Sequence, residues 1–247
     1  MWVRKMIVKN RLGLIETVET MINQQHRLDQ VANNLANVDT PGFRRSASTF
    51  QEVLIERQGA LARVGKGLKV KQDTSSGPLI QTDNPLDLAI NGRGWFRVES
   101  PDGPRYTRAG NFRLDRQGRI VTQAGDPVAG TSGAIDASGG QVSITSDGTV
   151  SVNNIVKDRI RLVDFADGEL ENAGDNLFRL KNADTSEGPA PDAGLAQGYL
   201  EGSNVKSMVE MTDMIDLTRG FESQQKVITV IDDIDHQAIS SVGRLNP

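Results

Sequence analysis

The side chains that most often perform chemistry in proteins are scarce in this chain. Cysteine is absent, and only two histidines, His26 and His236, are present. The absence of cysteine excludes disulfides, thiol catalysis and cysteine-ligated metals. Two histidines 210 residues apart in the sequence do not suggest a histidine-centred triad or a multi-histidine metal site, so only paired carboxylates remain as a source of acid–base chemistry.

Two further patterns resemble phosphate- or cation-binding motifs. The run 65–67 (Gly-Lys-Gly) lacks the Ser or Thr that follows the lysine of a phosphate-binding loop, and Ala60 stands where that loop needs its first glycine. Asp232, Asp233 and Asp235 have helical spacing, without the glycine and distal glutamate of a calcium loop. We interpret them as a solvated acidic face, and we predict no cofactor, no metal site and no enzymatic activity.

The distribution of charge argues against nucleic acid as a partner. The formal net charge is −4, whereas nucleic-acid-binding domains are usually basic. Residues 1–72 carry twelve Lys or Arg and six Asp or Glu, and residues 201–247 carry four and eight. Opposite charges at the two ends favour their pairing, within or between molecules. Two independently solvated faces are the alternative.

No segment of the sequence has the length of a membrane span. The N-terminus carries Arg4, Lys5 and Lys9 around an apolar run of only three residues, 6–8, which is too short for a secretory signal. No other apolar run approaches the roughly 20 residues that a helix needs to cross a bilayer. We therefore expect that export, if it occurs, does not use a cleaved signal peptide.

The segment 12–40 has the pattern of an amphipathic helix. Its side chains follow the alternating three- and four-residue steps of a heptad seam at Leu14, Val18, Met21, Gln25, Leu28, Ala32 and Leu35. Ile15 and Ile22 widen this stripe on one side, and Val31 and Val38 widen it on the other. The stripe is broader than a two-stranded seam requires, so this helix is expected to contact several neighbours.

A second heptad seam lies at the other end of the chain. It comprises Met214, Leu217, Phe221, Gln224, Ile228, Ile231, Asp235, Ala238, Val242 and Leu245. Gln224 and Asp235 are polar seam positions of the kind that fix register, and Gly220 costs about 1 kcal/mol relative to Ala. Ser203 or Asn204 is a plausible N-cap. Such a stripe also suits an ordinary helical core, but two of them at opposite ends favour helices that pack on each other and on further copies.

The intervening sequence is of a different type. From about 86 to 180, short alternating runs are separated by Asn-Gly, Asp-Gly or other glycine-containing turns, which predicts a mostly antiparallel β-domain built of hairpins. Its aromatic residues are expected to form the core and not a ligand platform: Trp95, Phe96, Tyr106, Phe112, Phe165 and Phe178. The fold class predicted is therefore α+β, with two terminal heptad helices packing together around a central β-domain.

The end of the first helix is the most distinctive motif. The run 33–43 reads Asn-Asn-Leu-Ala-Asn-Val-Asp-Thr-Pro-Gly-Phe. Proline disfavours helical backbone at the preceding residue, so the helix should end at or just before Thr40. Taken alone, clustered asparagines are typical of an ordinary helix C-cap.

Three motifs together resemble the rod and hook family of bacterial flagellar axial proteins. The run 33–43 is similar to that family's helix end and Thr-Pro-Gly turn. The runs 87–96 (Asp-Leu-Ala-Ile-Asn-Gly-Arg-Gly-Trp-Phe) and 106–122 resemble its strand pair and hairpin. The run 198–205 (Gly-Tyr-Leu-Glu-Gly-Ser-Asn-Val) is similar to its entry into the C-terminal helix. The three occur in the family's order and span most of the chain.

The resemblance implies a structural subunit of the flagellar basal-body rod. It implies assembly with copies of the chain and with other flagellar rod proteins, a periplasmic location and export through the flagellar type III apparatus. A short connector and the length of 247 residues are nearer to the proximal rod type, with the distal rod type as the alternative. A secreted carbohydrate-binding β-domain is a further alternative, which would need an exposed aromatic platform or catalytic carboxylates.

The expected organisation has five parts. They are an N-terminal extension over residues 1–11, an axial helix over 12–40, a connector arm over 41–84, a β-domain over 85–198 and a second axial helix over 199–247. We expect the asparagines at the helix end to bond between subunits. The residues predicted to carry subunit assembly are Leu14, Val18, Met21, Leu28, Asn33, Asn34, Leu35, Asn37, Pro41, Gly42, Phe43, Met214, Leu217, Phe221, Gln224, Ile228 and Ile231.

Overall fold

The computed structural model describes residues 2–57, 60–182 and 185–243, with side chains described over 17–49, 69–182 and 185–237. The chain divides into two compact units. The first comprises residues up to 36, 46–70 and 206 onwards, and the second comprises 37–45 and 71–205. The first unit contains both helices, and the second contains most of the strands, so the α+β class predicted from the sequence is confirmed.

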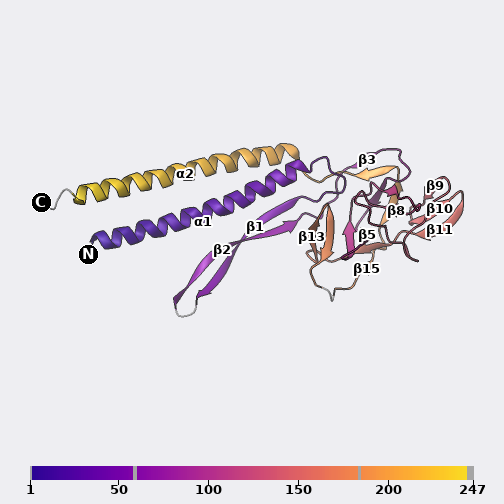
Figure 1. Ribbon diagram of the computed structural model, residues 1–247, viewed down its shortest axis with the longest axis horizontal. Helices are drawn as coiled ribbons and strands as arrows, with labels where there is room; N and C mark the ends of the chain where they lie inside the picture. The colour runs from indigo at the N-terminus through magenta and orange to yellow at the C-terminus, as the bar shows by residue number, and fades with distance from the viewer. Residues whose placement is uncertain (1, 58–59, 183–184, 244–247) are drawn as a thin grey trace. The chain divides into compact units, whose positions relative to one another are not determined.

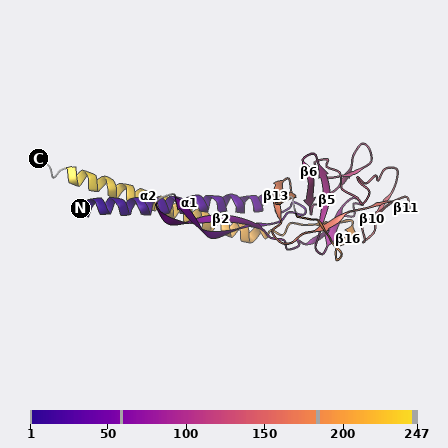
Figure 2. The same ribbon diagram turned by 90° about the horizontal axis from the view of Figure 1, so that it is seen from below.

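Two long helices dominate the first unit. Helix α1 spans Trp2–Ala36, and α2 spans Ser207–Gly243. They lie side by side and run antiparallel (Figures 1 and 2), because Gln24 of α1 contacts Leu217 and Asn34 contacts Glu210. Strands β1 (Ser46–Arg57) and β2 (Ala60–Gln72) complete the unit as a two-stranded sheet, of which β1 contacts α1.

The first helix differs from expectation at both ends. It begins at Trp2, so residues 2–11 continue the helix where a separate extension was expected, since no proline or glycine interrupts the chain before Gly13. It ends at Ala36, because Asn37 starts a turn: its carbonyl accepts the Thr40 N–H at 3.2 Å, and its side-chain Oδ1 accepts the Thr40 hydroxyl at 3.1 Å. The local hydrogen bonds of Asn and Thr compete with helical ones.

The expected connector and the second helix also differ in extent. Residues 41–84 hold the β1–β2 sheet and β3 (Leu79–Gln81), which sequence reading missed because no Asn-Gly turn marks the strands. Residues 199–201, the start of the expected C-terminal part, form strand β17 and pair with β3, and α2 starts at Ser207, a few residues after the expected N-cap. Asn204 does not cap α2, because its side chain bonds Arg45, Asp73 and Ser75 of the second unit.

The second unit is the β-domain. Its largest sheet has the strand order β13-β14-β6-β5-β12-β15. Smaller sheets are β11-β10-β9, β16-β4, β17-β3 and β7-β8. The remaining strand bounds are β4 Leu88–Asn91, β5 Trp95–Ser100, β6 Gly103–Thr107, β7 Arg113–Leu114, β8 Ile120–Val121, β9 Val142–Ile144, β10 Thr149–Val152, β11 Ile155–Arg159, β12 Leu162–Asp164, β13 Leu170–Gly174, β14 Leu177–Leu180, β15 Gly188–Pro189, β16 Gly194–Gln197 and β17 Tyr199–Glu201.

Hairpins generate this antiparallel pattern, as the turn residues predicted. Strands β5 and β6 pair from Phe96↔Thr107 to Ser100↔Gly103. Strands β10 and β11 are joined by Asn153 and Asn154, which both have positive φ, the geometry of a tight two-residue hairpin turn. Asparagine tolerates this backbone better than most residues.

Two apolar clusters form the core of the second unit. The larger includes Leu88, Phe96, Val98 and Val150, and the smaller contains Trp95, Tyr106, Val163, Phe165 and Phe178. The six aromatic residues predicted to be core are all buried. Trp95 and Phe178 pack with ring centroids 4.8 Å apart, within the usual range for aromatic pairs.

Candidate assembly surface and helix-end junction

The seam predicted on α2 is the least exposed line along that helix. Leu217 is buried, with 7% of its surface exposed, and the other five predicted positions up to Ile231 are half-buried: Met214, Phe221, Gln224, Ile228 and Ile231. Most of the residues between them are exposed. The heptad pattern therefore identified the face of α2 that packs against α1.

On α1 the packed face is rotated by about one residue from the predicted seam. Met21, Leu28 and Leu35 are half-buried as expected, but Val18 is 42% exposed, and Gln25 and Ala32 are also exposed. Positions 17, 24 and 31 take their place, and Val31 is buried. Both sets keep a seven-residue repeat. Val31 has a larger apolar side chain than Ala32 and therefore gains more from being buried. The side chain of Leu14 lies outside the described residues.

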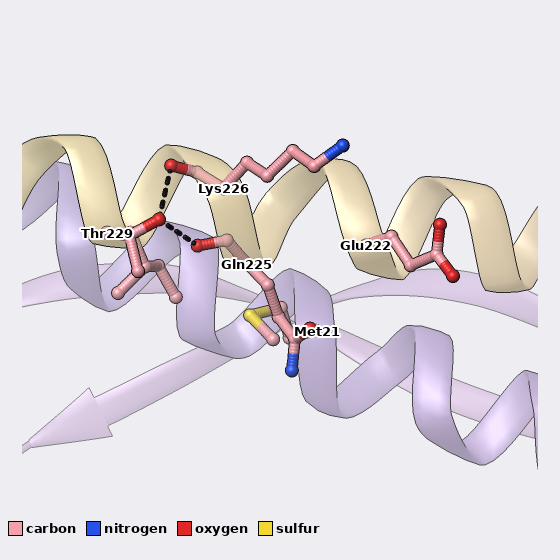
Figure 3. Close-up of a pocket in the computed structure, with 6 residues that line it drawn as sticks. Met21, Glu222, Gln225, Lys226 and Thr229 are labelled. Atoms are coloured by element: carbon pink, nitrogen blue, oxygen red, sulfur yellow. Dashed lines mark hydrogen bonds between the residues drawn. The ribbon is translucent and has the colours of Figure 1, made fainter.

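A groove runs along the outside of the helix pair. It is lined by Met21 of α1 and by Glu222, Gln225, Lys226, Ile228 and Thr229 of α2. Figure 3 shows the Gln225 side chain lying over Met21, while the Thr229 hydroxyl donates to the carbonyl oxygens of Gln225 at 3.1 Å and Lys226 at 2.9 Å. In a ligand site a few polar groups converge on one point. The polar groups of this groove do not converge.

A second apolar stripe of α2 remains exposed. We call the residues Met208, Met211, Ile215, Val227, Val230 and Ile234 the outer stripe. Met208 is 76% exposed and Ile215 is 53% exposed. At about 100° per residue, these positions occupy the half of the helix opposite the seam.

Polar side chains make defined contacts between the helices. Gln24 Nε2 donates to the carbonyl oxygen of Leu217 at 2.7 Å. Asn34 Nδ2 donates to Glu210 Oε2 at 3.0 Å, and both side chains are fully buried. Asn34 also donates to the carbonyl oxygen of Ser46 and accepts the Ser46 N–H, each at 2.9 Å. Asn34 therefore fixes the start of β1 against α1 within the chain, and its amide is occupied there.

The turn after α1 belongs to the second unit. Gly42 has φ +68°, and its N–H donates to the carbonyl oxygen of Glu201 at 2.7 Å. A Cβ added at Gly42 would lie 2.3 Å from the Ala109 nitrogen, so only glycine fits this position. The Pro41 carbonyl accepts the Asn176 amide at 2.7 Å, and Phe43 is buried. Asn33 is exposed and Asn37 is half-buried.

A buried ionic cluster lies beside this turn. Glu201 Oε1 is 2.8 Å from Arg44 Nη2, and Glu201 Oε2 is 3.2 Å from Arg108 Nη1. Glu201 and Arg44 are each 1% exposed. Burial lowers the pKa of Arg108 to about 10, an effect that the Glu201 carboxylate partly opposes, so Arg108 keeps its charge at neutral pH. Two cations and one anion share the site.

Backbone groups complete the cluster. Gly77 N–H donates to Glu201 Oε1 at 3.0 Å, Arg108 Nη2 donates to the Gly92 carbonyl at 2.8 Å, and Arg44 Nη1 donates to the Ser75 carbonyl at 2.6 Å. The cluster thus links the turn after α1, the segment before β3 and strand β17. Sequence reading missed its importance, although Arg108 and Glu201 both lie within the quoted family-like motifs.

The described residues offer no cluster suited to metal binding. Over 17–49, 69–182 and 185–237, no three acidic or histidine side chains are grouped to hold a metal ion. Asp232, Asp233 and Asp235 are exposed on α2. Neither helix, over its described residues, has the apolar length of a membrane span. The organised features of the molecule are packing faces and a rigid turn.

Comparison with protein families agrees with these features. Residues 17–44 match the model described as "Flagella basal body rod protein", 89–152 match "Flagellar hook protein FlgE/F/G D1 domain", and 196–241 match "Flagellar basal body rod FlgEFG protein C-terminal". These ranges contain the helix-end turn, the first hairpins of the β-domain and the entry to α2 with its seam.

Individual relatives extend the similarity over most of the chain. The flagellar basal-body rod protein FlgF of Caulobacter vibrioides is 36% identical over 90% of this chain and 94% of its own length. The rod protein FlgG of Bacillus subtilis is 37% identical over 92% and 98%, and FlgF of Salmonella typhimurium is 36% identical over 84% and 88%. The chain therefore belongs to the flagellar basal-body rod protein family.

Proposed function

We propose that this chain is a structural subunit of the proximal part of the flagellar rod, and that its terminal helices carry assembly with copies of itself and with other rod proteins. The observation that carries this proposal is the outer stripe of α2, where six large apolar side chains remain exposed although the seam beneath them is already packed on α1. Exposed apolar side chains of this kind, grouped at 208–215 and at 227–234, mark an interaction site.

The geometry of the stripe favours an open assembly. Pairing of the stripe with its own copy would close at two subunits, so an open assembly requires the stripe to meet a different face of the next subunit. Such heterologous contacts generate helical filaments when the rotation between subunits does not close a ring. A rod built from stacked subunits is an assembly of this type.

The two units have different tasks under this proposal. Helical residues within 12–40 and 199–247 make the axial contacts, and the β-domain within 85–198 forms an outer layer. The predicted seam residues from Met21 to Leu35 and from Met214 to Ile231 support the pairing of α1 with α2. Val18 and Ile22, exposed on α1, are available for contacts with neighbours.

The proximal type is favoured over the distal type. FlgF proteins of several organisms are among the relatives, and the length of 247 residues is nearer to the proximal type. FlgG proteins are also relatives at comparable identity, so the distal rod is the alternative. Electron microscopy of purified basal bodies with this subunit labelled distinguishes the two, because the label marks either the cell-proximal or the hook-proximal end.

The remaining features of the proposal follow from membership of the rod. The subunit acts in the periplasm, is exported through the flagellar type III apparatus without a cleaved signal peptide, and has no catalytic activity. The alternative of a carbohydrate-binding β-domain is not favoured, because the six aromatic residues that could form a platform are buried.

Substituting one residue of the outer stripe tests the assembly role. In cells that lack the gene, the Ile215→Glu variant should leave the monomer folded, because the side chain is exposed, but should abolish motility and rod formation. Ile215→Leu is the matched control and should restore motility. Normal rods containing Ile215→Glu would refute a role for the outer stripe in assembly.

A further inference from the structure

Helix α2 presents two apolar faces, and only one of them packs on α1. The seam offers Met214, Leu217 and Phe221, and the outer stripe offers Met208, Met211 and Ile215 in a stretch that begins six residues earlier. Burial of apolar area alone does not distinguish the two faces strongly, since each carries side chains of similar size. A polar contact must therefore help to decide which face turns inward.

Gln24 and Gly220 supply such a contact. Gln24 Nε2 reaches the Leu217 carbonyl at 2.7 Å, and a Cβ added at Gly220 would lie 2.3 Å from the same Nε2 atom. The missing side chain at Gly220 thus leaves the space that the amide occupies. In a helix, a backbone carbonyl is open to a neighbouring side chain only where the surrounding side chains leave room.

The space at Gly220 has no equivalent elsewhere in the described part of α2. Gly220 is the only glycine between Ser207 and Gln237. One heptad away stand Asp213 and Val227, whose side chains would fill the corresponding space. Glycine within a helix costs about 1 kcal/mol relative to alanine, so its presence here requires a compensating role.

We propose that Gln24 and Gly220 form a polar key that selects the seam, and not the outer stripe, as the face of α2 that packs on α1. The pairing places a half-buried polar contact where only one orientation satisfies it. Single polar seam residues specify helix pairing in this way at some cost in stability. This inference rests on the proposed function in one respect: the orientation it selects keeps the outer stripe available for another subunit.

Thiol labelling of the purified full-length chain tests the key. The chain has no cysteine, so Leu217→Cys reports on the seam and Ile215→Cys reports on the outer stripe, each in a separate protein. Because a buried thiol reacts only after local opening, the thiol at 215 should react with a maleimide at least about tenfold faster than the thiol at 217. Gln24→Leu should reduce this ratio toward one, and Gly220→Leu, which fills the space, should do the same.

The neighbouring residue provides the matched control. Gln25 is exposed, and its Nε2 donates to Asp29 on the same helix at 2.9 Å, so Gln25→Leu should leave the ratio unchanged. Circular dichroism checks that helix content is kept. If Gly220→Leu loses helix, Gln24→Leu still decides the question, since it leaves α2 unaltered.

Two results would overturn the inference. One is a tenfold ratio that survives in Gln24→Leu with helix content intact. The other is a ratio near one in the unsubstituted chain, because the key would then hold neither orientation. The labelling uses free subunits, so it is independent of the motility experiment: loss of the key with normal dependence of motility on Ile215 would leave the proposed function standing.

Discussion

Replacement of Glu201 by glutamine removes the only anion from the ionic cluster beside the helix-end turn. The variant keeps the volume of the side chain but leaves Arg44 and Arg108 buried with no opposing charge at 2.8 and 3.2 Å. Breaking a buried ion pair from one side typically costs about 3–5 kcal/mol, because the remaining charge stays desolvated. Domains of this size are stable by only about 5–15 kcal/mol, so the loss should be easily measured.

Urea denaturation followed by tryptophan fluorescence is the appropriate assay. Trp95 lies in the smaller core cluster, and Arg108 sits over its ring at 5.7 Å from the ring centroid. A Trp2→Phe background makes Trp95 the only fluorescent tryptophan, since the chain has two. The midpoint should fall with Glu201→Gln while the slope of the transition is kept.

A surface pair supplies the control for charge alone. Glu171 Oε1 is 2.6 Å from Arg179 Nε, closer than the Glu201 contacts, but the two side chains are 39% and 54% exposed. Exposed pairs contribute about 0–1 kcal/mol, so Glu171→Gln should have a small effect. Equal losses for Glu201→Gln and Glu171→Gln would refute the argument that burial determines the importance of the cluster.

Three further predictions concern individual residues. Gly42→Ala should destabilise the second unit by more than about 2 kcal/mol in the same urea assay, because left-handed backbone costs about 1–2 kcal/mol and the new Cβ meets the Ala109 backbone. Gly103 also has positive φ but has open space around it, so Gly103→Ala should cost less. The reverse order would contradict the steric argument. Asn34→Ala should lower the free energy of unfolding of the first unit by about 1–3 kcal/mol, because it leaves the buried groups it bonds without that partner. Gln25→Ala, at an exposed site, should change this free energy little, and an unchanged value in Asn34→Ala would show that its contacts are dispensable. Hydrogen bonds from Thr145 and Thr149 lower the pKa of Asp147 to about 2 from its ordinary 3.8, so its contribution to stability is present above pH 3.8 and is lost as the pH falls toward 2. In Asp147→Asn the free energy of unfolding should therefore fall less between pH 3.8 and 2 than it does in the unsubstituted chain. An identical fall in both proteins would refute the assignment.

The turn chemistry and apolar periodicity of the sequence predicted much of the fold. Paired turn residues such as Asp102-Gly103 and Asp147-Gly148 have local conformational preferences that hold in any context, so these hairpins were visible without a structure, whereas the Asn153-Asn154 turn before β11 was not predicted. The seam of α2 was likewise predicted from Met214 to Ile231, whereas Asp235, the next predicted seam position, is exposed. The β1–β2 sheet was missed, because nothing in its local sequence distinguishes a paired strand from an extended connector.

The candidate site was predicted less completely than the fold. Gly42 was recognised as part of a turn, but the reason that only glycine fits there is a backbone segment, 108–109, that is 66 residues distant in sequence. The asparagines of the run 33–37 look alike in sequence, yet Asn34 is buried with three hydrogen bonds while Asn33 is exposed. The expectation that these asparagines bond between subunits stays a prediction for Asn33 and Asn37, whereas the amide of Asn34 is used within the chain.

The sequence by itself determined the family, the two helical ends and the hairpin character of the middle, because these depend on residue spacing and on local turn preferences. The tertiary structure alone decided which line of α1 faces α2, since two heptad sets differing by one residue are nearly equivalent until a partner surface is present. It alone assembled Arg44, Arg108 and Glu201 into one buried cluster. Contacts between residues far apart in sequence depend on how the whole chain closes, and no local pattern encodes that closure.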